Sequence, residues 1–409
     1  MPSIRRVSTS PRTGFTLIEL LVAMAITLTI MGSVVALFAS VNQGINESIG
    51  SISVQERLRH ARNLLADDLA HLTVNPAIPP TAERAGGGYL SIVAGATDKA
   101  AYVDSGTSLG QNAEALRLLQ TWKGVTSDSL AFTIRGRSFP SSGLHGISSG
   151  GPGEPTAAEV VWAVSNGVLY RRVLPILPGH VASGTTSSLS QDEFYSGTSS
   201  AGYPPLNVSR RFDGTTGTFN SLVDLEEPTN RHVLNYATAE VLSESVVLDN
   251  VVGFDVRVWD PGAPLFQVTD SNGNLVIVEP SDGAYEAAIS NNATIAGFGA
   301  FVDVGYAYTS PVGSPPAQFS STSPPGGGSG TYDTWTRQRD GLDTGNPIER
   351  PSDGLDSDGR GGVDDPGERA DSVSPPYLAP LKAVQITIRV YEPASQTIRE
   401  VTIRQGFTN

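Results

Sequence analysis

Glu19 is the residue whose surroundings in the sequence point most directly to chemistry. It is the only ionisable side chain in an apolar run that extends from Phe15 to Phe38. A carboxylate in such a run is costly when it has no partner, so it normally pairs with another group or serves a function. Two interpretations follow: Glu19 lies near a helix end and its side chain reaches the water interface, or it pairs with a positive charge.

Residues 352–368 form a second candidate site, because closely spaced carboxylates and glycines can bind a hard cation. The candidate ligands are Asp353, Asp356, Asp358, Asp364 and Asp365. Ca²⁺ requires several oxygen atoms at about 2.3 to 2.6 Å around a sharply turning chain. The segment resembles the Asp-Gly-x-Asp-x-Asp-Gly calcium loops of exported bacterial proteins, although Gly354 stands at the first ligand position of an EF-hand. We expect a structural Ca²⁺ and no required cofactor; the alternative is a solvated acidic loop.

Other side chains do not form a pattern that is typical of an enzyme. The five histidines lack metal-ligand spacing, and the sequence contains no phosphate loop and no His-Glu-x-x-His motif. Asp67 and Asp68 are adjacent on a predicted helix and point in different directions, so we expect a solvated helix face rather than an acid and base pair. The tryptophans are expected to anchor the core or loops: Trp122, Trp162, Trp259 and Trp335. The sequence therefore predicts a protein that is not an enzyme.

The residues before and within the apolar run predict a membrane anchor. Residues 1–14 carry three arginines and no acid, which is typical of a leader on the cytoplasmic side. Residues 15–38 are long enough to span a bilayer as a helix, since about 20 apolar residues suffice at a rise of about 1.5 Å. A secretory signal has a shorter apolar core and small residues at its far end, whereas here Gly14 precedes the run. The sequence predicts that the leader is removed and the helix retained.

A distinctive sequence, Gly-Phe-Thr-Leu-Ile-Glu-Leu-Leu-Val-Ala, occupies residues 14–23. It resembles the class III signal of type IV prepilins and type II secretion pseudopilins. The resemblance implies that prepilin peptidase cuts between Gly14 and Phe15, that Phe15 is N-methylated, and that Glu19 pairs with the Phe15 amine of a neighbouring subunit. The implied partners are prepilin peptidase, other pilin-like subunits and inner-membrane lipid. The implied location is a single-pass inner-membrane anchor with a headpiece in the periplasm or, in a filament, outside the cell.

Residues 39–75 are predicted to continue the helix as an amphipathic segment. Apolar residues recur there at spacings of three and four: Val54, Leu58, Ala61, Leu65, Leu69 and Leu72. Gly44 and Gly50 lower helix propensity and predict a kink or frayed stretch near 42–52. Pro76 predicts the end of the helix, because the residue before a proline disfavours helical geometry.

Short β-favouring segments predict an α+β headpiece over residues 76–409, with one half-buried antiparallel sheet packed on the long helix. The segments are 116–122, 129–135, 158–163, 168–174, 245–259, 301–308, 383–391 and 397–405. Asn166-Gly167 predicts a tight turn between two of them. Their order is similar to that of the J-type minor pseudopilins and PilW-type minor pilins. That resemblance implies that 75–115, 175–240 and 260–378 are insertions, and the Ser, Pro and Gly content of 310–331 predicts a flexible surface loop.

Composition narrows the function further. The net charge of −14 argues against a nucleic-acid partner, and the absence of cysteine excludes disulfides and thiol chemistry. The leading hypothesis is a minor subunit that joins or caps a pilus-like filament. The alternative is a module that binds a surface or a secreted substrate and is displayed on a pilin-like helix. A membrane-tethered hydrolase is the third and least supported hypothesis.

Overall fold

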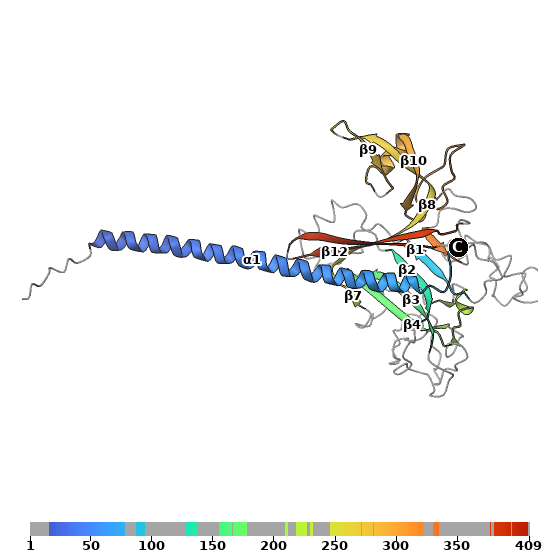
Figure 1. The fold of residues 1–409 in the computed structure, drawn as a ribbon, viewed down its shortest axis with the longest axis horizontal. Helices are drawn as coiled ribbons and strands as arrows, with labels where there is room; N and C mark the ends of the chain where they lie inside the picture. Colours follow the sequence, from blue (N-terminus) through green and yellow to red (C-terminus); the bar gives the residue numbers. More distant parts are fainter. Residues whose placement is uncertain are drawn as a thin grey trace, which may run out of the picture. The chain divides into compact units, whose positions relative to one another are not determined.

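The computed structural model divides the chain into two units, residues 1–53 and 54–409 (Figure 1). It describes residues 16–77, 87–94, 128–136, 155–165, 167–177, 209–211, 218–226, 230–231, 246–270, 272–280, 282–321, 330–334, 377, 380–393 and 395–407.

Helix α1 spans Leu17–Ala70 and contributes to both units. Its N-terminal part is long and apolar enough to cross a membrane. Residues 42–52, where Gly44 and Gly50 predict a kink or fraying, are helical. After the helix ends, Leu72 pairs with Ile134 in an isolated bridge, so the chain passes directly from α1 into β pairing.

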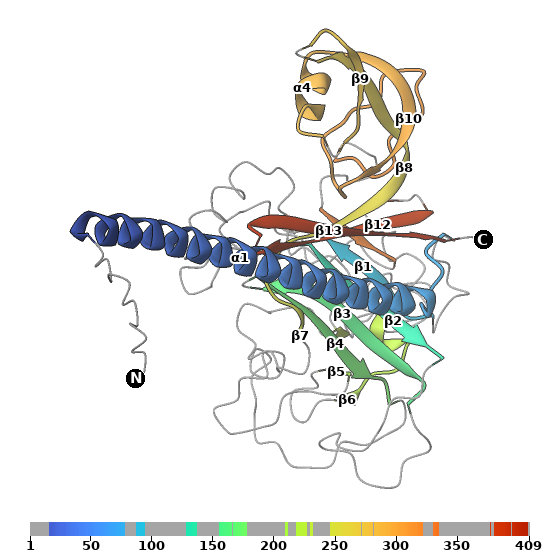
Figure 2. The ribbon, with the colours of Figure 1, turned by 60° about the vertical axis from the view of Figure 1, so that its left-hand side comes forward.

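A six-stranded antiparallel sheet has the order β11-β1-β2-β3-β4-β7 (Figure 2). Its strands are β1 (Leu90–Val93), β2 (Ser129–Arg135), β3 (Ala157–Ser165), β4 (Val168–Pro175), β7 (Val246–Leu248) and β11 (Thr331–Asp333). The predicted hairpin is confirmed as β3 and β4, which pair from Ser165↔Val168 onward. Gly167 adopts a φ of 73° in the turn, a conformation that glycine reaches without steric cost.

A second, five-stranded sheet has the order β10-β8-β12-β13, with β9 also paired to β8. Its strands are β8 (Val251–Thr269), β9 (Leu275–Val278), β10 (Thr294–Val302), β12 (Ala383–Glu392) and β13 (Thr397–Gly406). The expectation of a single sheet is therefore wrong. The two sheets meet near Asp128, whose N–H donates to Phe254 O at 3.1 Å and whose Oδ2 accepts from Val256 N–H at 2.7 Å. These two hydrogen bonds, one from the backbone and one to a side chain, connect the sheets where no continuous ladder of strand pairing does.

The buried stripe of α1 lies in the same apolar core as strands of both sheets. Its members are the predicted residues Val54, Leu58, Ala61, Leu65 and Leu69. Strands from each sheet contribute to this core, among them Phe132, Trp162, Phe254 and Ile388. The predicted α+β class, with a long helix packed on antiparallel sheets, is confirmed.

The six-stranded sheet is buried on its second face as well. The apolar cluster on that face includes Leu225 of the 3-10 helix η3 (Asp224–Glu226) and the neighbouring Leu222. Nearby, β5 (Arg210–Arg211) pairs with β6 (Thr218–Phe219). Glu159 is fully buried in β3 and accepts hydrogen bonds from Tyr89 Oη and from Ser209 Oγ. Arg231 forms a buried ion pair with Asp333 of β11. The expectation of a half-buried sheet is wrong here, because part of the predicted insertion 175–240 packs on it.

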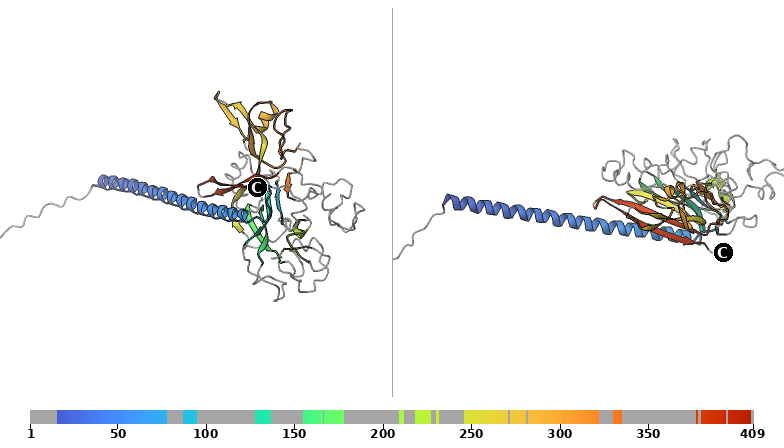
Figure 3. Two further views of the ribbon diagram at one scale, coloured as in Figure 1. Left: turned by 45° about the vertical axis from the view of Figure 1, so that its right-hand side comes forward. Right: turned by 90° about the horizontal axis from the view of Figure 1, so that it is seen from above.

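Residues 260–321 form a lobe on the C-terminal part of β8, drawn in yellow and orange in the left view of Figure 3. The lobe includes helix α4 (Tyr285–Ser290) and has an apolar cluster of its own. Asp260 is fully buried, and its Oδ2 accepts hydrogen bonds from the N–H groups of Gln318 and Phe319 at 2.8 and 2.9 Å. A Cβ on Gly262 would lie 2.0 Å from Pro316 O, so glycine is required at this close approach.

This packing corrects the prediction of a flexible surface loop at 310–331 for residues 317–321, whereas residues 322–329 lie outside the described residues. Phe319 is fully buried and Ala317 is buried in the apolar cluster of the lobe. Ser320 forms a β-bridge with Tyr306. The composition of the segment did not predict its order, because the hydrogen bonds that hold it come from Asp260, far away in the sequence.

Asp68 links α1 to the six-stranded sheet. It is fully buried and accepts two hydrogen bonds from Arg171 of β4, at Nε and Nη2, both at 2.7 Å. Its Oδ2 also accepts from Trp162 Nε1 of β3 at 3.0 Å. The prediction of a solvated helix face at Asp67 and Asp68 is therefore wrong for Asp68. A bidentate carboxylate and guanidinium pair fixes both distance and orientation.

Asp68→Ala is expected to destabilise the headpiece by about 3 to 5 kcal/mol, because it leaves a largely buried guanidinium without its partner. Asp67→Ala is the matched control: it alters the exposed neighbouring residue and is expected to cost less than about 1 kcal/mol. Urea unfolding of the full chain in detergent, followed by tryptophan fluorescence, measures both. Equal unfolding midpoints for the two variants would contradict the role assigned to Asp68.

Asp255 in β8 is a buried carboxylate whose hydrogen-bond acceptors are only partly satisfied. Arg257 and Arg389 lie 3.1 and 3.5 Å from its Oδ2, whereas its Oδ1 has no hydrogen-bond partner among the described residues. Burial raises the pKa of Asp255 above its usual value, with a further increase from the negative charge of Asp303, and the two guanidinium groups offset this only in part.

A raised pKa means that the folded state holds this proton more tightly than the unfolded chain. The contribution of Asp255 to stability is therefore complete below about pH 4, the usual range of an aspartate pKa, and is lost as pH rises through the folded pKa. Asp255→Asn cannot titrate and is expected to flatten this decline in the free energy of unfolding between acid and neutral pH. The exposed Glu56→Gln on α1 is the control, and urea midpoints across a pH series are the measurement. A slope in Asp255→Asn equal to that of the unaltered chain would refute the assignment.

Candidate functional site

Glu19 and Thr16 form a capping box at the start of α1. The backbone N–H and the Oγ1 of Thr16 both donate to Glu19 Oε2 at 2.9 Å, and the Glu19 N–H donates to Thr16 Oγ1 at 3.3 Å. These reciprocal bonds satisfy backbone donors that a helix N-terminus otherwise leaves unpaired. The sequence interpretations considered only a partner outside the chain or the water interface. The spacing Thr-x-x-Glu was the signal that could have predicted this cap.

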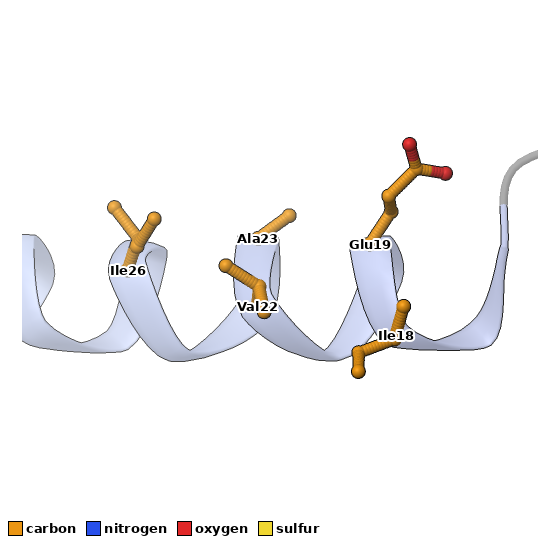
Figure 4. Close-up of a pocket in the computed structure, with 5 residues that line it drawn as sticks. All are labelled: Ile18, Glu19, Val22, Ala23 and Ile26. Carbon is orange, nitrogen blue, oxygen red and sulfur yellow. The ribbon is translucent and has the colours of Figure 1, made fainter.

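Glu19 stands at the N-terminal end of an apolar strip of the helix surface. The strip is lined by Ile18, Glu19, Val22, Ala23 and Ile26 (Figure 4). In Figure 4 the Glu19 side chain projects away from the helix, on the same side as Ala23. Glu19 Oε1 has no hydrogen-bond partner among the described residues, whereas Oε2 holds the cap. The carboxylate therefore retains an accepting atom that faces away from its own helix.

The apolar side chains of α1 from Leu17 to Phe38 are exposed in the chain by itself. Leu17 is 83% exposed and Phe38 65%, values that a surface in water rarely sustains over so long a run. The hydroxyl groups within the run have internal partners: Thr27 donates to Ala23 O at 2.7 Å and Thr29 to Ala25 O at 2.9 Å. Such internal bonds leave no side-chain donor unsatisfied in a hydrocarbon environment. This surface is suited to lipid or to other apolar helices.

Several predicted site residues lie outside the described residues. These are Gly14 and Phe15 at the predicted cleavage position, and all five candidate calcium ligands: Asp353, Asp356, Asp358, Asp364 and Asp365. Within the part of the chain that the structure describes, no group of three or more His, Asp or Glu side chains could hold a metal ion. Calcium binding therefore stays a prediction.

Two of the four tryptophans lie in the described residues, and both are packed on neighbouring side chains. Trp162 is fully buried beneath α1. Trp259 packs edge to face on Phe301, with ring centroids 5.2 Å apart. The prediction that tryptophans serve as anchors is confirmed for these two.

Comparison with protein families identifies one feature of the chain. The model of the prokaryotic N-terminal methylation motif matches residues 9–35, which include the predicted cleavage position, Glu19 and much of the apolar run. No curated protein and no solved structure matches the chain. The motif indicates a pilin-type substrate of prepilin peptidase, and the apolar helix that follows fits membrane anchoring.

Proposed function

We propose that the mature chain begins at Phe15 and is a minor pilin or pseudopilin that assembles at the tip of a type II secretion pseudopilus or a type IV pilus. The observation that carries this proposal is the methylation motif at residues 9–35 together with a carboxylate in the first turn of an exposed apolar helix. The headpiece is then periplasmic, or extracellular in the assembled filament, and the helix resides in the inner membrane before assembly.

Cleavage after Gly14 would create a positively charged amine one residue before the helix cap. The N-terminus of a helix already carries partial positive charge, so a second positive group there is unfavourable unless an acid offsets it. Glu19 is the only acid in the first turn. We expect Glu19 Oε2 to keep its bonds to Thr16, and Oε1 to accept from the Phe15 ammonium of a neighbouring subunit. The pairing then needs no loss of the cap.

The size of the headpiece supports a position at the tip rather than within a shaft. It holds two larger sheets and the lobe of residues 260–321, which would be difficult to repeat along a closely packed filament. The order of the β3–β4 hairpin, β8 and β12 also supports the J-type or PilW-type assignment, as the sequence resemblance implied.

Mass spectrometry of the chain purified from membranes tests the processing step. The expected product lacks residues 1–14 and carries a methyl group on the amine of Phe15. A Gly14→Val variant, which blocks the predicted cleavage position, is expected to retain its leader. An intact Met1 in the unaltered chain would disprove processing.

Co-purification with other pilin-like subunits tests the assembly step. Glu19→Gln keeps the length and capping geometry of the side chain but removes its charge, so processing should continue while co-purification falls by about tenfold or more. Glu56→Gln removes an exposed acid farther along α1 and should leave co-purification unchanged. If the unaltered chain is processed but recovers no other pilin-like subunit, the display alternative is preferred.

The acidic segment 352–368 is proposed to bind a structural Ca²⁺ in addition to this role. Isothermal titration of the full chain in detergent should detect Ca²⁺ binding that is lost in Asp356→Asn/Asp358→Asn, because each substitution removes a charged oxygen ligand. Asp67→Asn is the control for general loss of negative charge. Absence of a binding heat in the unaltered chain would leave the solvated acidic loop as the correct interpretation.

A further inference from the structure

Strand β9 is an edge strand of the lobe. Among the described residues, no second strand pairs with its outer side. It pairs only with β8, in unbroken antiparallel register from Phe266↔Val278 to Thr269↔Leu275. On an edge strand, alternate residues direct their N–H and C=O groups away from the sheet. Figure 2 shows β9 beside β8 and α4 in the lobe. Its outer side is therefore a row of backbone donors and acceptors that another strand could join.

The other edges of this sheet carry features that discourage such pairing. On the opposite side of β8, strand β10 has register shifts at Ile295/Gly297 and Phe298/Ala300. Strand β13 presents charged residues along its length, including Arg399, Glu400 and Arg404. Bulges and charges are the usual means by which proteins keep edge strands from associating. Strand β9 has neither.

The side chains of β9 are apolar and unusually exposed. Leu275 and Ile277 are on one face and are 68% and 50% exposed, and Val276 is 36% exposed. Val278, by contrast, is buried in the apolar cluster of the lobe and anchors the end of the strand. Exposed apolar residues along a regular strand edge mark a site of strand addition, where backbone bonds provide affinity and alternate side chains provide selectivity.

The ionisable residues of the lobe carry a single sign of charge. Residues 260–321 contain no Lys, Arg or His, and they contain six acids: Asp260, Asp270, Glu279, Asp282, Glu286 and Asp303. Asp270 and Glu279 stand at the two ends of β9. The hydrogen bond from the Asn274 backbone lowers the pKa of Asp270, so this carboxylate is charged at neutral pH. A strand that pairs with β9 would therefore lie close to a carboxylate at each end of β9.

We infer that β9 is a docking edge for an extended segment of another polypeptide in which apolar residues alternate with lysine or arginine. The apolar side chains would cover Leu275 and Ile277, and the cations would approach Asp270 and Glu279. A second copy of this chain does not fit, because two β9 strands side by side would bring acidic ends together in a lobe that has no cation to offset them. The inference concerns the lobe alone and does not depend on filament assembly.

Fluorescence anisotropy tests this inference with the full chain in detergent and a labelled peptide of alternating lysine and valine. Saturable binding is expected, and Leu275→Thr/Ile277→Thr should weaken it by about tenfold or more because the apolar contact is lost while strand propensity is kept. Thr294→Ser changes an exposed residue of the bulged strand β10 without changing charge and should alter binding less than about twofold, since it lies at the other edge.

A second peptide, of alternating glutamate and valine, tests the role of charge. It should bind at least about tenfold more weakly, and Glu279→Gln should narrow the difference between the two peptides. Circular dichroism verifies that each variant is folded. Equal binding of both peptides, or unchanged binding by Leu275→Thr/Ile277→Thr, would overturn the inference. So would dimers of the unaltered chain that dissociate in that variant, because they would identify a second copy as the occupant.

Discussion

The headpiece depends on one buried ion pair between the long helix and the sheet beneath it. Apolar burial along α1 provides most of the driving force, but it is not directional and would tolerate small rotations of the helix. Asp68 removes that freedom, because its two carboxylate oxygens face Arg171 from β4 and its Oδ2 also meets Trp162 from β3. A buried carboxylate that is fully hydrogen-bonded specifies one arrangement, since any other would leave a charge without compensation.

The same principle recurs wherever distant segments meet in this headpiece. Asp128 joins the two sheets, Glu159 holds the cover on the second face of the six-stranded sheet, and Asp260 holds the end of the lobe in place. In each case a short acidic side chain accepts hydrogen bonds from the other segment. A chain rich in glycine and proline loops has few long ladders to align its parts, and buried acceptors serve that purpose instead.

Local patterns predicted much of this structure, whereas partnerships across the sequence did not. The spacing of Leu58, Leu65 and Leu69 predicted the buried face of α1, and Asn166-Gly167 predicted the β3–β4 hairpin. The burial of Asp68 was not predictable, because its partners lie 94 and 103 positions away. For the candidate site, the sequence around Glu19 predicted the apolar helix and the prepilin-type signal. The cap formed by Thr16 was missed, and cleavage after Gly14 stays a prediction. The division into two sheets follows from contacts of Asp128 that no periodicity reveals.

The internal bonds of Thr27 and Thr29 have a consequence for how the helix could change surroundings. Each hydroxyl keeps its acceptor within the same helix, so its hydrogen bond does not depend on whether acyl chains or neighbouring protein lie outside. Transfer of this segment from one dry environment to another would break none of these bonds. The free energy of such a transfer is then set by packing alone, as the proposed passage of the helix from a membrane into a filament would require.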